Sequence, residues 1–394
     1  MKTVFDNATL VLPEGIFPHM AVGVENGKIT ETGKKGTVSG SVTVDCEEKY
    51  LSAGFVDIHV HGGGGHDFMD ATVDASVGAM TAHMKHGTTT IVPTSLTAED
   101  YELEAFFNSM KTIKSSPEAK VLPYIPGTHL EGPYVAPAQA GAQDPKYIKA
   151  PTPESWRKLM KLADGQILIW TVAPELPGAI DIAKELRKEG VLFSAGHSCA
   201  KYDDAVAALD AGYSMATHLY SSMSTIIREN GYRVPGLLEA AMLHDGYAVE
   251  VIADGKHLPV SLLQLIYKTK TKERICLITD AMRGAGMPDG DYLLGSLSKG
   301  QLVSVFDGIA HMPDGISFAG SVCTTDRLVR TMWKSAGLPL NEVIQMMTVN
   351  PAREIGISDR KGQLRPGYDA DIVVFDDNVN VDRVVIGGET TYKA

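Results

Sequence analysis

The feature that most constrains the fold of this chain is the alternation, across its centre, of short strand-like runs with longer helix-like stretches. Such alternation is typical of parallel β/α units, in which each helix returns the chain so that the next strand runs in the same direction. Residues 71–86 and 202–211 carry helical patterning between such runs. The strand-like runs predict a closed, TIM-type (β/α)8 barrel, an α/β fold, with strands at residues 55–60, 89–93, 124–129, 167–172, 192–195, 214–218, 249–253 and 275–279.

The two ends of the chain have a different, β-rich texture. Short apolar runs alternate with turn residues near the start, where Glu25-Asn26-Gly27-Lys28 is a hairpin signal, and similar runs return near the end. We expect both ends to pair in one small β-sandwich domain, formed by residues 1–51 plus 353–394. The barrel would then comprise residues 52–352, with an insertion at 302–318 forming a hairpin over its mouth.

Composition excludes several classes of protein. The 394 residues include 36 Lys and Arg against 48 Asp and Glu, a net charge of −12, which argues against a nucleic-acid-binding surface. No apolar stretch approaches the roughly 20 residues that cross a membrane, and no basic leader precedes a hydrophobic segment. We therefore expect a cytoplasmic protein without membrane or nucleic-acid partners. An anionic substrate would need a local cationic pocket.

Two histidines end the first predicted strand. Residues two apart in a strand share a face, so the imidazoles of His59 and His61 point the same way. Neutral imidazole is the commonest protein ligand for transition metals. Taken alone, the pair fits a metal site and an ordinary strand with exposed histidines equally well.

The ends of the other predicted strands carry related chemistry. Barrel enzymes place catalytic groups at the carboxyl ends of their strands, and Glu131, His197, His218 and Asp280 all follow predicted strands there. Histidine and carboxylate ligands suit zinc or ferrous iron, and a carboxylate can bridge two ions. A bound divalent ion lowers the pKa of its water to about 7, and a nearby carboxylate can move the proton. Each residue could instead serve a turn or a helix cap, but together they predict hydrolysis of a carbonyl compound.

These motifs resemble the amidohydrolase superfamily and, within it, the N-acetylglucosamine-6-phosphate deacetylase family. The resemblance covers nearly the whole chain. His129-Leu130-Glu131-Gly132-Pro133 is its most specific part, because related superfamily branches usually bridge their metals with a modified lysine. The matching segments lie at residues 54–62, 129–134, 196–198, 216–220, 253–257, 277–281, 318–321 and 350–352.

The resemblance implies a metal centre with one or two divalent ions per subunit, zinc or iron being expected. Glu131, His197 and His218 would hold the principal ion. His59 and His61 would join Glu131 around a second ion. The retention of both histidines favours two ions.

The resemblance also implies how the substrate is handled. Asp280 would act first as general base and then as general acid, while His257 would polarise the acetamide carbonyl. Ala319 and Gly320 would offer backbone groups to the sugar. The implied products are glucosamine 6-phosphate and acetate, and the implied assembly is a homodimer in which an arginine reaches the phosphate from the partner subunit.

Three departures from the family pattern lie around the substrate. Gln143 stands where the family usually has a histidine that touches the sugar, and Ser221 and Ser222 replace an Asn-Ala pair. The segment that carries the phosphate-binding arginine is longer, so Arg228 and Arg233 are both candidates. A related N-acyl amino sugar or another amide therefore remains an alternative substrate. A non-catalytic scaffold barrel is disfavoured, because every expected metal ligand is present.

Overall fold

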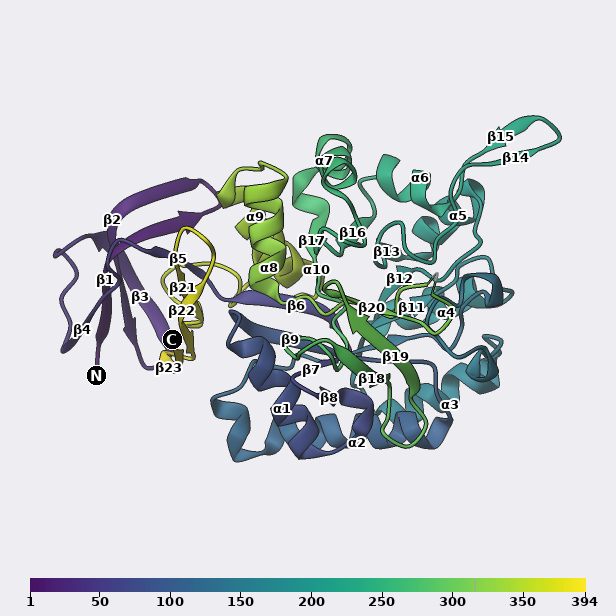
Figure 1. The fold of residues 1–394 in the computed structure, drawn as a ribbon, viewed down its shortest axis with the longest axis horizontal. Helices are drawn as coiled ribbons and strands as arrows, with labels where there is room; N and C mark the ends of the chain where they lie inside the picture. The colour runs from purple at the N-terminus through teal and green to yellow at the C-terminus, as the bar shows by residue number, and fades with distance from the viewer. Residues whose placement is uncertain (316) are drawn as a thin grey trace.

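In a computed structural model, described here for residues 1–315 and 317–394, the chain forms a large barrel with a smaller sheet domain beside it. Both termini lie in the sheet domain, at the left of Figure 1. The barrel occupies the rest of the molecule, and its helices surround the strands. This arrangement confirms the predicted fold class.

Eight parallel strands form the barrel in the hydrogen-bonded order β17-β16-β13-β12-β11-β10-β9-β6. A parallel bridge from Val60 to Ala281 brings the two edges of this sheet together, so the barrel is nearly closed. The third strand starts at Thr128 rather than at residue 124, because Pro126 lacks the N–H that would continue the ladder. The strands are β6 (Phe55–Val60), β9 (Thr88–Ser95), β10 (Thr128–Glu131), β11 (Ile167–Val172), β12 (Leu192–Ala195), β13 (Tyr213–Ala216), β16 (Ala248–Val251) and β17 (Ile275–Leu277).

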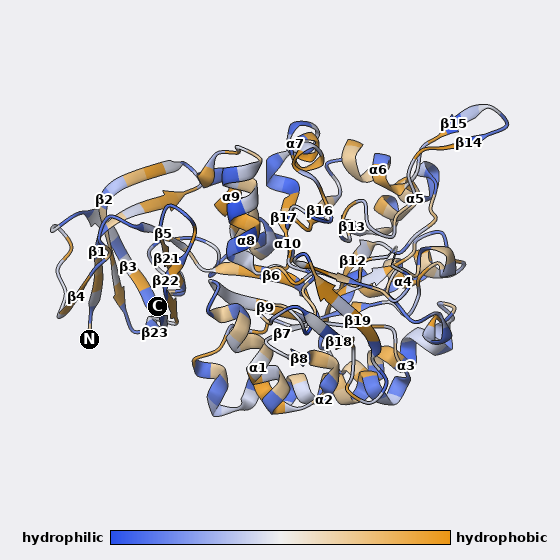
Figure 2. Cartoon of the chain, viewed as in Figure 1, coloured by the Kyte–Doolittle hydropathy of each residue, from blue (hydrophilic) through white to orange (hydrophobic). Residues whose placement is uncertain are grey.

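Helices cover the outside of the barrel, and the strands beneath them are buried. Every residue of β6 and β9 is buried, as expected for parallel strands packed on both faces. Figure 2 shows mainly hydrophobic colour on β6, whereas the outer helices alternate between apolar and polar colours. No helix in the described part of the chain is long and apolar enough to cross a membrane. The helices are α1 (Val73–Met84), α2 (Asp100–Ser115), α3 (Pro153–Ala163), α4 (Ala179–Leu186), α5 (Tyr202–Ala211), α6 (Leu237–Leu243), α7 (Val260–Thr269), α8 (Thr325–Arg330), α9 (Leu340–Met347) and α10 (Val349–Glu354).

As predicted, both ends of the chain pair in one small β domain, and their strands form a single mixed sheet. Its strand order is β23-β22-β21-β5-β1-β2-β3, and β4 pairs with β1. The ends meet where β5 and β21 run antiparallel, with Ala53 opposite Ile372. The chain enters the barrel immediately afterwards, at Phe55; the exact domain limits at 51 and 353 stay a prediction. The strands are β1 (Thr3–Leu12), β2 (Gly15–Glu25), β3 (Lys28–Lys34), β4 (Val42–Asp45), β5 (Tyr50–Ala53), β21 (Ile372–Phe375), β22 (Val381–Ile386) and β23 (Glu389–Lys393).

Two insertions extend from the barrel. The first is a three-stranded sheet of β18 (Gly290–Leu294), β19 (Gln301–Phe306) and β20 (Ile309–His311), larger than the hairpin predicted at 302–318, a range in which residue 316 lies outside the described residues. The buried Arg283 anchors this sheet by pairing with Asp70 and donating to the carbonyls of Leu293 and Gly295. The second is a hairpin of β14 (Ile227–Glu229) and β15 (Tyr232–Val234), which projects from the barrel in Figure 1.

A buried histidine connects α1 to the segment that follows the first barrel strand. His83 is fully buried, and its Nε2–H donates to the carbonyl oxygen of Gly62 at 2.8 Å, in the short strand β7 (Gly62–Gly63). Burial lowers the pKa of His83 to about 4. The neutral ring is therefore the form that the folded protein accommodates.

This lowered pKa predicts a loss of stability in acid. The unfolded chain binds a proton at His83 near pH 6.5 and the folded chain only near pH 4, so the contribution is present above pH 6.5 and is lost as pH falls. Between pH 7 and pH 5, wild type should lose about 2 kcal/mol more unfolding free energy than His83→Gln, which keeps an N–H donor. Denaturant titrations of both metal-free proteins measure this difference. Equal losses would contradict the assignment.

Candidate metal and substrate site

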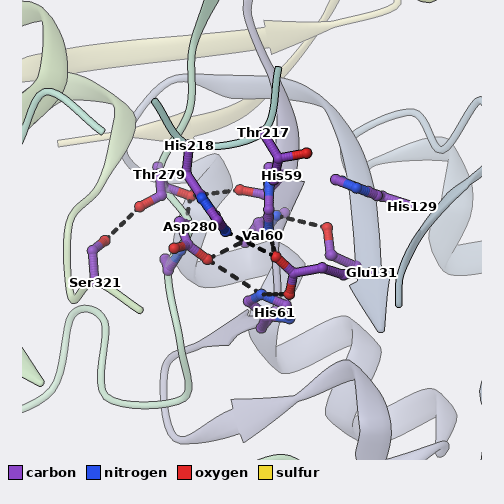
Figure 3. A network of polar contacts seen from close by, with 12 residues as sticks. His59, Val60, His61, His129, Glu131, Thr217, His218, Thr279, Asp280 and Ser321 are labelled. Carbon is purple, nitrogen blue, oxygen red and sulfur yellow. Dashed lines mark hydrogen bonds and ion pairs between the residues drawn. The ribbon is translucent and has the colours of Figure 1, made fainter. Parts of the chain in front are cut away.

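The side chains that the sequence associates with metal and proton chemistry meet at the carboxyl ends of the barrel strands, as Figure 3 shows for most of them. All are buried, although they come from five separate strands or from the loops that follow them. All of them except His59 line one cavity, which Leu294 of β18 also borders. The set consists of His59, His61, Glu131, His197, His218 and Asp280.

One group of three ligand atoms is especially close. Glu131 Oε1 lies 3.1 Å from His197 Nε2 and 3.1 Å from His218 Nε2, and the two imidazole nitrogens are 3.1 Å apart. His197 Nδ1 donates to the carbonyl oxygen of Gln139 at 2.9 Å, which leaves a lone pair on Nε2. A carboxylate oxygen and two imidazole nitrogens at these distances repel one another unless a proton or a metal cation lies among them. This cluster therefore fits a metal ion.

A second group adjoins the first. His59 Nε2 and His61 Nε2 lie 3.5 Å and 3.2 Å from Asp280 Oδ1, and the three side chains could hold a cation together. Glu131 faces this group as well, because its Oε2 is 3.4 Å from His61 Nε2. Among the described residues, the buried Nε2 of His59 has no hydrogen-bond partner. The geometry therefore offers a second position for an ion next to the first.

The electrostatics of the cluster favour a positive charge. Burial opposes ionisation of Glu131, but the neighbouring His197 and His59 hold its pKa well below the usual range. Burial likewise opposes the charge of Asp280, yet His59 and His61 lower its pKa to about 2. Against the effect of burial, Glu250, Glu131 and Asp280 raise the pKa of His59 to about 10. The carboxylates are thus charged at neutral pH and attract a cation to the imidazoles.

Three of these residues have an uncommon backbone conformation. His197, His218 and Asp280 have φ angles of 48°, 25° and 48°, in the left-handed region that costs non-glycine residues about 1–3 kcal/mol each. Hydrogen bonds hold them there: Asp280 N–H donates to His59 O at 2.9 Å, and its carbonyl accepts from Ser321 N–H at 2.7 Å. The fold therefore maintains strained backbone at the ends of these strands, which turns the side chains toward a common point.

A cavity of about 260 Å³ opens beside the clusters, close to the lower size limit of small-molecule sites. The predicted substrate residues that line it are Gln143, Ser221, Ser222, His257 and Gly320. Ala319 is buried behind it, and its N–H is occupied by Ala310 O. Arg228 and Arg233 are exposed on the β14–β15 hairpin and do not line it. Among the described residues, no lysine or arginine borders the cavity.

Gln143 contacts the metal cluster as well as the cavity. Its Nε2 donates to Glu131 Oε2 at 2.6 Å, and its Oε1 accepts from the N–H of Thr97 at 2.7 Å. Because both ends of the amide are engaged, the side chain is held in one orientation. Gln143 therefore positions Glu131 and keeps one further N–H available to a ligand.

His257, in the loop after β16, also borders the cavity. Its ring Nδ1 donates to Asp254 Oδ2 at 2.9 Å, and its backbone N–H donates to Asp254 Oδ1 at 2.8 Å. Burial disfavours the charge of Asp254, but these bonds and the His257 ring lower its pKa below the usual value. The bonds to Asp254 fix the orientation of the His257 ring, so that Nε2 is the ring atom that can contact a ligand in the cavity.

Sequence reasoning missed one residue that touches the cluster. Glu250 lies in the middle of β16, is fully buried, and accepts from His59 Nδ1 at 2.9 Å. The available signal was a carboxylate in the apolar run Ala248-Val249-Glu250-Val251, since a buried carboxylate requires compensation.

Comparisons with known proteins agree with this geometry. The amidohydrolase family model matches residues 50–391. The chain is 34% identical over 392 residues to the N-acetylglucosamine-6-phosphate deacetylase of Lysinibacillus sphaericus, which covers 98% of this chain and 97% of that protein. It is 32% identical over 351 residues to the N-acetylgalactosamine-6-phosphate deacetylase of Escherichia coli O157:H7, with 89% of each covered. The structure matches that of an N-acetyl-D-glucosamine-6-phosphate deacetylase mutant from Mycobacterium smegmatis in complex with N-acetyl-D-glucosamine-6-phosphate, with a TM-score of 0.90, 30% identity, and 100% and 99% of the two chains covered.

The packing at Gly320 predicts that a side chain at this position destabilises the backbone beside Asp280. Gly320 has a φ of +66°, and a Cβ there would lie 2.8 Å from the carbonyl oxygen of Asp280. Gly286 has a similar φ of +73° with nothing within 4 Å of its Cβ position, so Gly286→Ala is a matched control. Denaturation should show that Gly320→Ala loses about 1–3 kcal/mol more stability than the control, because only Gly320→Ala adds a steric clash. Equal losses would mean that the backbone near Asp280 can move freely.

Proposed function

Because the chain belongs to the N-acetylglucosamine-6-phosphate deacetylase family of the amidohydrolase superfamily, we propose that it removes the acetyl group of N-acetylglucosamine 6-phosphate by hydrolysis. The products are glucosamine 6-phosphate and acetate. The observation that carries the proposal is the convergence of Glu131, His197 and His218 on one point, next to Asp280 and a cavity of suitable size. The substrate bound in the Mycobacterium smegmatis relative supports the same sugar.

The metal ligands follow from the two clusters. Glu131, His197 and His218 would hold the principal divalent ion, and His59 and His61, which also face Glu131, would hold a second. Histidine and carboxylate donors suit zinc or iron. When bound, such an ion supplies an activated water and polarises a carbonyl oxygen.

Asp280 and His257 move and hold protons in this proposal. As the water oxygen attacks the acetamide carbon, Asp280 accepts a water proton. His257 donates its Nε2–H to the carbonyl oxygen, with Asp254 stabilising the ring. The C–N bond then breaks, and Asp280 returns the proton to the amine nitrogen, so that water is added across the amide. Its low pKa keeps Asp280 ionised and ready to accept a proton.

Gln143, Ser221, Ser222 and Gly320 bind the sugar in this proposal. Their hydroxyl, amide and backbone groups line the cavity and can hydrogen-bond to sugar hydroxyls. N-Acetylgalactosamine 6-phosphate is the second candidate substrate, because a relative named for that sugar is 32% identical to this chain. The two sugars differ only in the orientation of one hydroxyl group, and a site that hydrogen-bonds this group can separate them.

A second copy of the chain supplies the phosphate-binding group in this proposal. Among the described residues, no lysine or arginine lines the cavity, whereas Arg228 and Arg233 are exposed on the β14–β15 hairpin. Exposed Ile227 and Tyr232 on the same hairpin offer apolar surface for contact with another subunit. A homodimer in which each hairpin reaches the partner's cavity would place an arginine next to the sugar phosphate.

Asp280→Asn tests the chemistry. The variant cannot accept the water proton, so acetate release should fall about 10²- to 10⁴-fold, while bound metal stays largely unchanged. Acetate release is measured with the 6-phosphates of N-acetylglucosamine and N-acetylgalactosamine and with unphosphorylated N-acetylglucosamine. Retained activity in Asp280→Asn would refute the role of Asp280. No turnover of either phosphate by the metal-loaded wild type would refute the proposed substrate class.

Mixing of variant subunits tests whether an arginine of the partner subunit binds the phosphate. Arg228→Ala with Arg233→Ala should raise the KM for the phosphorylated sugar about 10- to 100-fold, because a charge-assisted hydrogen bond is worth roughly 1.5–3 kcal/mol. Turnover of the unphosphorylated sugar should not change. Mixing this variant with Asp280→Asn should restore activity, since mixed dimers combine an intact cavity with an intact partner hairpin. Failure to restore activity in demonstrated mixed dimers would place the phosphate-binding group elsewhere.

A further inference from the structure

Glu250 lies directly beneath the metal cluster, on the inner side of the barrel. Its side chain is fully buried, and Oε2 accepts from His59 Nδ1 at 2.9 Å and from the backbone N–H of His218 at 3.2 Å. One carboxylate oxygen therefore contacts a residue from each of the two ligand clusters. His218 has the left-handed φ of 25°, so the second bond supports a strained position.

We propose that Glu250 is a positioning residue on which the retention of the second ion, at His59 and His61, depends. The proposal rests on the metal assignment in the proposed function. By accepting the Nδ1–H, Glu250 fixes the His59 tautomer whose Nε2 lone pair faces the cluster. The carboxylate also makes Nε2 of His59 a stronger electron-pair donor to a metal ion, as carboxylates next to metal-bound imidazoles do.

The charge of Glu250 is what points to an ion rather than to packing alone. An amide oxygen could accept the same two hydrogen bonds, yet the strand carries a carboxylate, which is costly to bury. Among the described residues, its ion-pair contact is with His59 alone, and no lysine or arginine is in salt-bridge contact with it. Its charge is therefore compensated through the His59 ring, by a proton or by a cation on Nε2.

Glu250→Gln separates these roles, because the amide keeps the shape and an acceptor oxygen but removes the charge. Zinc per subunit is measured by elemental analysis after dialysis against increasing chelator concentrations. Cys276→Ala is the matched control, since Cys276 is a buried neighbour of Glu250 on β17 and is not part of either ligand cluster. Glu250→Leu removes the acceptor as well.

We expect wild type and Cys276→Ala to release their two ions in two steps. In Glu250→Gln, the chelator concentration that removes the first ion should fall about 10- to 100-fold. The concentration that removes the second ion should not change. Glu250→Leu should lose that ion at least as easily. In a His61→Asn background, which already lacks the second site, Glu250→Gln should change zinc affinity less than about threefold.

Stability provides an independent reading. Metal-free Glu250→Gln should be more stable than metal-free Glu250→Leu, because the amide oxygen still accepts from His59 Nδ1 and from the N–H of His218. An unchanged first release step in Glu250→Gln, equal weakening of both ions, or a wild type that binds a single ion would each overturn the proposal. Because no substrate is present in these measurements, a wrong substrate assignment would leave their outcome unaffected.

Discussion

The structure depends on one electrostatic constraint: several acceptor atoms are held at about 3 Å from one another in a buried space. Glu131 Oε1 and the Nε2 atoms of His197 and His218 are the tightest group. Such an arrangement is unfavourable unless a proton or a metal cation lies among these atoms. The closed barrel provides the rigid frame that brings these atoms together from separate strands.

Maintaining that constraint requires support from the backbone and from neighbouring side chains. Left-handed backbone at His197, His218 and Asp280 aims the side chains, and hydrogen bonds from neighbouring strands keep it in place. Glu250, Gln139 and Gln143 orient the ligands from behind and from the side. Hydroxyl groups of Ser221 and Ser222 and the amide of Gln143 line the adjoining cavity. In the proposed function, the buried ligand clusters support the chemistry and these polar groups recognise the sugar.

The sequence predicts those parts of the molecule that follow from local pattern. All eight barrel strands were expected, because each is a short apolar run bounded by turns, and the pairing of the two chain ends was expected from their shared texture. The ligand set followed from residue type at successive strand ends, and the structure brings these residues together. Their roles stay predictions until metal and activity are measured.

Other parts depend on three-dimensional contacts and could not be predicted. The insertion is a three-stranded sheet rather than a hairpin, and Arg283 anchors it through contacts with residues distant in the sequence. Nothing local indicates that His218 has a positive φ or that Glu250 lies under His59. Likewise, only the fold shows that the arginine hairpin points away from the cavity of its own chain.

The central claim is that the buried acceptor cluster is a metal site that hydrolyses an N-acetyl sugar phosphate. Its most direct test is a titration of metal-depleted protein with zinc or ferrous iron, in which acetate release from N-acetylglucosamine 6-phosphate and bound ions per subunit are measured together. We predict no release without metal and activity that rises with occupancy, reaching its plateau by two ions per subunit. Acetate release by fully metal-depleted protein would contradict the account.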